Sequence, residues 1–62
     1  MYECNLIIVE SFFQIHKNSV EHWREGNIKK YWRDDRGVYC IMYDSDKWWH
    51  YQFDKQLILR WW

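Results

Sequence analysis

The stretch of sequence that organises the chain is Val38-Tyr39-Cys40-Ile41-Met42-Tyr43-Asp44-Ser45-Asp46-Lys47-Trp48-Trp49-His50-Tyr51-Gln52-Phe53. Two runs rich in aromatic and branched residues flank a polar tetrapeptide, and such runs are typical of β-strands. The Asp and Ser side chains of the tetrapeptide can hydrogen-bond to the nearby backbone, which favours a turn. The stretch therefore predicts a β-hairpin with a four-residue loop, in which Met42 lies opposite Trp49 and Tyr43 lies opposite Trp48.

The chain on either side of this hairpin predicts two more segments that pack with it. Residues 28–33 alternate weakly, as in a strand, and the following Asp34-Asp35-Arg36-Gly37 fits a type I turn with Gly in the left-handed position. A bulged loop of this kind places Trp32 opposite Cys40 and Tyr31 opposite Ile41. The apolar segment 57–62 forms either a last strand or a short helix, and it packs on the core.

The first 25 residues fit both a strand and a helix. Residues 2–8 alternate like a strand, while apolar residues from 6 to 23 also follow the three-and-four spacing of a helix. Asn5 and Gly26 would bound one long helix, but the β-branched run 7–9 favours a strand. The compromise is a strand near 3–9 and a helix that begins near residue 11 or at a Ser19 cap and ends near 25. Residues 1–62 thus predict one small α+β domain, with a helix packed on a three- to four-stranded antiparallel β-meander.

The predicted pairing sorts the strand side chains onto two faces, because successive side chains in a strand point to opposite sides. The face expected to pack on the helix carries Ile28, Trp32, Val38, Cys40, Met42, Trp49, Tyr51 and Phe53. The opposite face combines aromatic and basic residues without an acid, and its candidate binding residues are Lys29, Tyr31, Arg33, Tyr39, Tyr43, Trp48 and His50. The alternative is that the N-terminal segment or the last two Trp cover this second face, or that it pairs with a second copy.

The size and composition of the chain favour an exposed aromatic surface. A domain of this length buries only about 60% of its unfolded surface, whereas the 62 residues include six Trp, five Tyr and three Phe. Some of these rings must therefore lie at the surface, where an aromatic cluster usually marks an interface. With two cysteines, acid near the N-terminus and an apolar run of only four residues, the sequence predicts a cytoplasmic protein with reduced thiols and no membrane partner.

An aromatic and basic sheet face suits two kinds of partner. Trp, Tyr and Arg dominate protein interfaces, and bases of single-stranded nucleic acid stack on aromatic rings while Lys and Arg meet phosphates. The net charge of zero favours a protein, since phosphate binding normally needs a basic surface. We therefore expect a protein-interaction module of the inhibitor, adaptor or regulator type, with a protein partner or self-association, and single-stranded nucleic acid binding as the alternative.

Catalytic and metal-binding motifs find little support in the sequence. Gly26 and Gly37 are the only glycines, so the chain has neither a phosphate-binding glycine loop nor a nucleophile elbow. The cysteines and histidines have no recognised zinc spacing, and the segment from Asp44 lacks the Gly and Glu of a calcium loop. The sequence predicts a non-enzymatic protein with no catalytic residue, no metal site and no cofactor.

The composition also leaves a third interpretation open. The chain contains no Ala, no Pro and no Thr, although average usage predicts about three Pro at this length. The absence of these three residue types is compatible with a fold of artificial or recent origin that has no evolved function.

Overall fold

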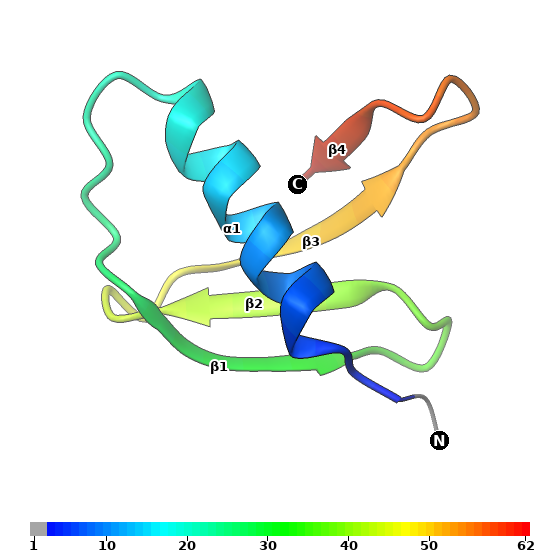
Figure 1. The fold of residues 1–62 in the computed structure, drawn as a ribbon. Helices are drawn as coiled ribbons and strands as arrows, with labels where there is room; N and C mark the ends of the chain where they lie inside the picture. Colours follow the sequence, from blue (N-terminus) through cyan, green and yellow to red (C-terminus); the bar gives the residue numbers. More distant parts are fainter. Residues whose placement is uncertain (1–2) are drawn as a thin grey trace.

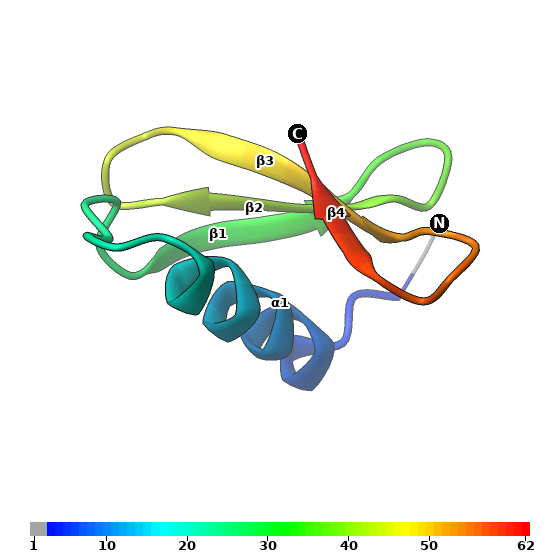
Figure 2. The ribbon, with the colours of Figure 1, turned by 90° about the horizontal axis from the view of Figure 1, so that it is seen from above.

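The computed structural model describes residues 3–62, which form one helix and four strands (Figure 1). The elements are α1 (Leu6–Ser19), β1 (Ile28–Arg33), β2 (Tyr39–Tyr43), β3 (Trp48–Phe53) and β4 (Leu59–Trp61). The strands make one antiparallel sheet in the order β1-β2-β3-β4, and α1 lies across one face of it (Figure 2). The predicted fold, one helix on an antiparallel meander, is confirmed. The segment 57–62 supplies the last strand.

Helix α1 occupies the segment whose pattern was ambiguous. Asn5 caps it, and the side-chain oxygen of Asn5 accepts hydrogen bonds from the N–H groups of Ile7 at 2.9 Å and Ile8 at 3.4 Å. The buried stripe is Val9, Phe12, Phe13 and His16. Burying one large apolar side chain is worth about 1.5–3 kcal/mol, whereas a β-branched residue in a helix costs at most about 0.7 kcal/mol. The predicted strand over 3–9 is therefore wrong, because the apolar stripe outweighs the β-branched run.

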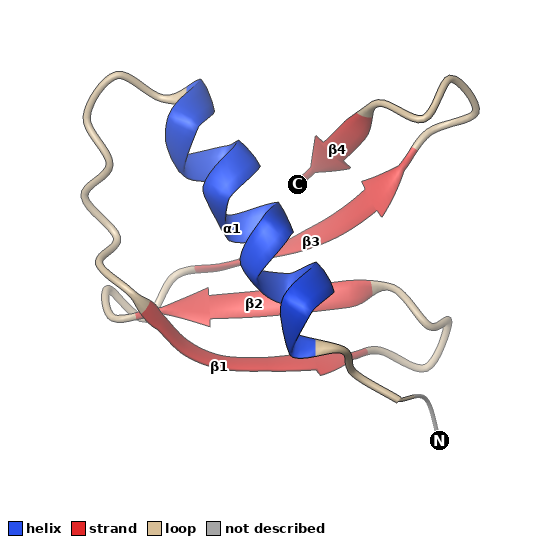
Figure 3. Ribbon diagram, in the orientation of Figure 1, coloured by secondary structure: helices blue, strands red, loops and turns tan. Residues whose placement is uncertain are grey.

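The predicted helix to residue 25 is also wrong, since the chain leaves the helix after Ser19 (Figure 3). The Ser19 hydroxyl donates to the carbonyl of Ile15 inside the last turn and caps no second helix. Trp23 instead folds back onto the core, and its indole N–H donates to the Gly26 carbonyl at 2.7 Å. Gly26 has φ +80°, and a Cβ there would lie 2.7 Å from the Asp44 side chain. Tertiary packing against the sheet thus shapes residues 20–27.

The three hairpin loops share one geometry, in which the third loop residue is left-handed. These residues are Gly37, Asp46 and Leu57, with φ of 82°, 69° and 62°. The predicted first loop is confirmed, with Trp32 opposite Cys40 and Tyr31 opposite Ile41.

The predicted register of the second hairpin is wrong by one residue. Met42 lies opposite Trp48 and Ile41 opposite Trp49. The Tyr43 N–H donates to the Lys47 carbonyl at 3.0 Å, which closes a three-residue loop rather than a four-residue one. Asp46 takes the left-handed position that Gly occupies in the first loop.

This register decides which side chains lie under the helix. The buried core on that side of the sheet contains Ile41, Tyr43, Tyr51 and Leu59, and Trp49 packs against it. The assignment of Trp49 and Tyr51 to the core face is therefore confirmed. The assignment of Trp32, Cys40 and Met42 to that face is wrong, because these residues belong to the opposite parity of β1 and β2.

The core contains one chain of buried hydrogen bonds. The Tyr51 hydroxyl lies 2.6 Å from Nδ1 of His16 and 2.7 Å from the Tyr43 hydroxyl. Burial lowers the pKa of His16 and raises the pKa of Tyr43 to about 12. All three groups are neutral at pH 7, and each has a hydrogen-bond partner within the chain. Their role is therefore structural.

No helix within residues 3–62 is long and apolar enough to span a bilayer. Cys4 and Cys40 are both free thiols.

Candidate functional site

Within residues 3–62, one face of the sheet has no helix on it, and we call it the open face (Figure 2). Successive side chains of a strand point to opposite faces of the sheet, so the strand residues that alternate with the core residues lie on this face. They are Lys30, Trp32, Cys40, Met42, Trp48, His50, Gln52 and Arg60. Trp62, just after β4, joins them by stacking on His50.

Four rings form a continuous aromatic row across the open face: Trp32, Trp48, His50 and Trp62. Neighbouring ring centroids lie 5.3 Å apart for Trp32 and Trp48, 4.9 Å for Trp48 and His50, and 4.9 Å for His50 and Trp62. The last pair is stacked with only 4° between the ring planes. Trp48 is 44% exposed and Trp62 is 55% exposed. The row is therefore a connected aromatic surface that is partly exposed to solvent, and each of its rings packs against the next.

The polar groups of the open face are mainly hydrogen-bond donors. Within residues 3–62, the indole N–H groups of Trp32, Trp48 and Trp62 have no acceptor, whereas the core residue Trp23 donates to a carbonyl. Lys30 lies over the Trp32 ring, with 5.6 Å from Nζ to the centroid. These groups can donate to a ligand that is rich in carbonyl oxygens.

Fixed charge on the open face is small and partly neutralised. Its cations are Lys30 and Arg60, and the Arg60 guanidinium pairs with Asp54 at 2.9 Å. The Asp34 carboxylate lies beside His50 at one end of the face. The face therefore lacks the excess of positive charge that phosphate recognition needs.

The seven predicted binding residues do not share one face of the sheet, so their predicted face assignment is wrong. Trp48 and His50 belong to the open face. Tyr31, Arg33, Tyr39 and Tyr43 lie on the other face, the side of the helix. The second loop is one residue shorter than predicted, which separates these residues from Trp48 and His50. Tyr43 is buried in the core.

The remaining predicted residues are engaged in the fold. Lys29 sits at a register irregularity of β1 and pairs with Asp46 of the second loop. Arg33 lies over the Tyr39 ring, with 4.7 Å to the centroid, and donates to the Gly37 carbonyl at 2.8 Å. Arg33 and Tyr39 also line a shallow hollow of about 350 Å³ beside the first loop.

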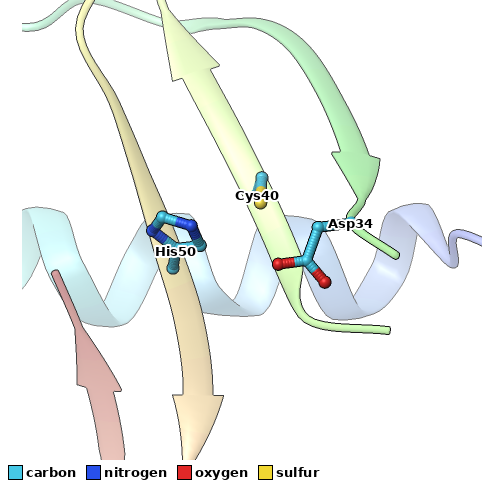
Figure 4. Close-up of side chains that lie close together, drawn as sticks. All are labelled: Asp34, Cys40 and His50. Carbon is cyan, nitrogen blue, oxygen red and sulfur yellow. The ribbon is translucent and has the colours of Figure 1, made fainter. Parts of the chain in front are cut away.

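A second feature of the open face is a cluster of three potential metal ligands, Asp34, Cys40 and His50 (Figure 4). One ligand atom of each lies within 4.8 Å of those of the other two. Asp34 begins the first loop, Cys40 is in β2, and His50 lies opposite Cys40 in β3. The first loop and the pairing of β2 with β3 thus bring together a carboxylate, a thiol and an imidazole.

The chemistry of this cluster does not suit a cysteine nucleophile. Burial, with a further contribution from the Asp34 carboxylate, raises the pKa of Cys40 to about 11, so the residue is a thiol at pH 7. The backbone N–H of Val38, then that of Arg36, lowers the pKa of Asp34. A catalytic triad would need the carboxylate on Nδ1 of His50, but Nδ1 faces the Trp62 carbonyl at 3.3 Å.

Sequence reasoning missed this cluster because its members are distant along the chain. Residues 34, 40 and 50 match no zinc spacing. The usable signal was the register of β2 and β3, since the observed pairing places Cys40 directly opposite His50. The predicted register placed these two residues on opposite faces.

Comparisons with family models, with curated proteins and with solved structures find no match for this chain. Its function is therefore inferred from the residues of the open face and their geometry.

Proposed function

We propose that the protein is a non-enzymatic interaction module, of the adaptor or regulator type, whose open face binds an extended proline-rich segment of a partner protein. The observation that carries the proposal is the exposed aromatic row, with three indole N–H donors that have no acceptor within residues 3–62. Tryptophan is among the residues most enriched in the energetic centres of protein interfaces.

Charge favours a protein partner over a nucleic acid. The whole chain has no net charge, and on the open face Arg60 is already paired with Asp54. A protein that binds phosphates normally neutralises several of them with Lys and Arg. An aromatic face with so little excess charge is better matched by an apolar peptide.

The hydrogen-bonding character of the face points to proline within that peptide. The open face presents indole N–H donors, and a proline-rich segment presents carbonyl acceptors while its prolines lack N–H groups. Such a segment is already extended as a polyproline II helix, so it loses little conformational entropy on binding, and aromatic-lined surfaces recognise it. Free Cys4 and Cys40 suit a reducing compartment such as the cytoplasm.

The test is a titration with a decaproline peptide, followed by tryptophan fluorescence and by NMR chemical shifts. We expect saturable binding that Trp48→Ala weakens about tenfold or more, the effect of losing roughly 1.4 kcal/mol at an interface. Tyr31→Ala is the matched control, because Tyr31 is an exposed aromatic residue on the helix side of the sheet. Both variants should retain the far-UV circular dichroism of the parent.

Two results would contradict the proposal. One is the absence of saturable decaproline binding, and the other is an equal loss of affinity in Trp48→Ala and Tyr31→Ala. A parallel titration with a mixed-sequence single-stranded oligonucleotide covers the other class of ligand. Saturable oligonucleotide binding whose affinity falls steeply with salt would indicate that the ligand is a nucleic acid rather than a proline-rich peptide.

A further inference from the structure

The donor set of the Asp34–Cys40–His50 cluster is that of a zinc site. Zinc binds cysteine thiolate, histidine nitrogen and carboxylate oxygen, whereas magnesium and calcium prefer oxygen ligands alone. We propose that Asp34, Cys40 and His50 bind one Zn²⁺ ion on the open face. This inference does not depend on the proposed peptide ligand.

The distances within the cluster are close to those of a tetrahedral site. The three ligand atoms lie within 4.8 Å of one another. Zinc at its usual bond lengths holds such atoms roughly 3.3–3.8 Å apart. Side-chain adjustments of about 1 Å would bring the three atoms to these separations, and all three side chains belong to one hydrogen-bonded sheet and its first loop.

The hydrogen bonding of His50 is an independent observation in favour of a metal. Its Nδ1 lies 3.3 Å from the Trp62 carbonyl oxygen, which can only accept, so Nδ1 carries the hydrogen. A metal would then bind through Nε2, and Figure 4 shows one ring nitrogen on the side of Cys40. Histidines that ligate metals usually donate their other N–H to a carbonyl or carboxylate in this way, which fixes the tautomer.

The Asp34 carboxylate is also oriented before any metal binds. Its Oδ1 accepts hydrogen bonds from the N–H groups of Arg36 and Val38, each at 2.9 Å. Within residues 3–62, Oδ2 accepts none. The loop therefore holds the carboxylate in place through one oxygen and leaves the other for a ligand.

Binding would form one Zn–S, one Zn–N and one Zn–O bond and release the Cys40 thiol proton to the solvent. Three protein ligands leave a fourth position of the tetrahedron for water or for a donor from a partner. The ion would connect the first loop with β2 and β3 and would hold His50, a member of the aromatic row, in its orientation.

The test is a titration of the reduced protein with Co²⁺, a spectroscopic substitute for Zn²⁺. We expect one equivalent to give a thiolate-to-cobalt charge-transfer band in the near ultraviolet and the visible bands of four-coordinate cobalt, and Zn²⁺ to displace both. Cys40→Ser should abolish the charge-transfer band, while Cys4→Ser, which removes the other free thiol, should retain it. Far-UV circular dichroism checks the fold of each variant.

Two further variants keep the test decisive if Cys40→Ser does not fold. Asp34→Asn retains an oxygen for the loop hydrogen bonds but lowers the donor strength, and His50→Gln removes the imidazole. Each should weaken Co²⁺ binding at least about tenfold, while His22→Gln, at an exposed histidine, should leave it unchanged. The proposal is overturned by the absence of a charge-transfer band in the parent protein. A band that follows Cys4 rather than Cys40, or binding indifferent to Asp34 and His50, would overturn it as well.

Discussion

Replacing Tyr51 by Phe tests the buried hydrogen-bond chain in the core. The Tyr51 hydroxyl lies between Nδ1 of His16 and the Tyr43 hydroxyl, at 2.6 Å and 2.7 Å. Whichever way the hydrogens point, this one oxygen is the partner of both groups. Tyr51→Phe deletes that oxygen and keeps the ring, so apolar packing is preserved while two buried polar groups lose their partner.

The size of the effect follows from the cost of buried, unpaired polar groups. Each such group costs about 1–3 kcal/mol, and two groups lose their partner, so the expected loss in Tyr51→Phe is about 2–6 kcal/mol. A domain of this size is stable by roughly 3–9 kcal/mol, and the substitution would remove a large part of that. Tyr43→Phe is the matched control, because it removes the hydroxyl at the end of the chain and leaves Tyr51 bonded to His16. Its expected cost is about 1 kcal/mol.

Urea unfolding followed by tryptophan fluorescence measures both variants. A loss of about 2–6 kcal/mol lowers the urea midpoint by roughly 2 M or more in a protein this small. The essential result is that Tyr51→Phe has a lower urea midpoint than Tyr43→Phe. Equal midpoints for the two variants, or a higher midpoint for Tyr51→Phe, would refute the assignment of Tyr51 as the shared partner.

Two further predictions concern the helix and its buried histidine. Burial lowers the pKa of His16 from 6.5, so the unfolded chain binds the proton more tightly than the folded one. Stability is then complete above about pH 6.5, declines as the pH falls below this value, and levels off below the lower pKa of the folded state. Urea midpoints between pH 7 and 5 should show this decline in the parent and in His22→Gln but a smaller one in His16→Gln. An unchanged slope in His16→Gln would contradict the prediction. Asn5→Ala removes the acceptor for the N–H groups of Ile7 and Ile8 and should cost about 1 kcal/mol. Asn5→Asp keeps an acceptor at the cap and should cost less, so an equal loss of thermal stability in both variants would argue against the cap.

The parts of the fold that were predictable depend on residues close together in the sequence. The loop from Asp34 to Gly37 has Asp and Gly where a type I turn with a bulge needs them, and its register was predicted correctly. Asn5 fits a helix cap in the long-helix alternative, and the structure shows that it caps a helix that ends at Ser19 rather than near Gly26. Local turn and capping chemistry is readable because each such position needs a particular backbone angle or a side-chain acceptor.

The second loop shows where this local signal ends. Asp46 adopts φ 69°, a region in which Gly is the usual residue. Two contacts attach this loop to β1 and to the segment before β1. Asp46 pairs with Lys29, and the Asp44 carboxylate accepts a hydrogen bond from the Asn27 N–H at 2.8 Å. These contacts join residues far apart in the chain, so the tetrapeptide alone did not reveal the three-residue loop.

The sequence by itself determined the aromatic strands, a polar loop at each strand junction, and more aromatic rings than so short a chain can bury. For the first 25 residues it left a strand and a helix open, and the structure decided for a helix over Leu6–Ser19. Only the tertiary structure decided which rings face the solvent and that Asp34, Cys40 and His50 meet. The physical reason is the two-residue period of a strand, which moves every side chain of β3 to the other face when the register changes by one. The energy that selects the register comes from packing β2 and β3 against α1, and no local stretch of sequence contains those contacts.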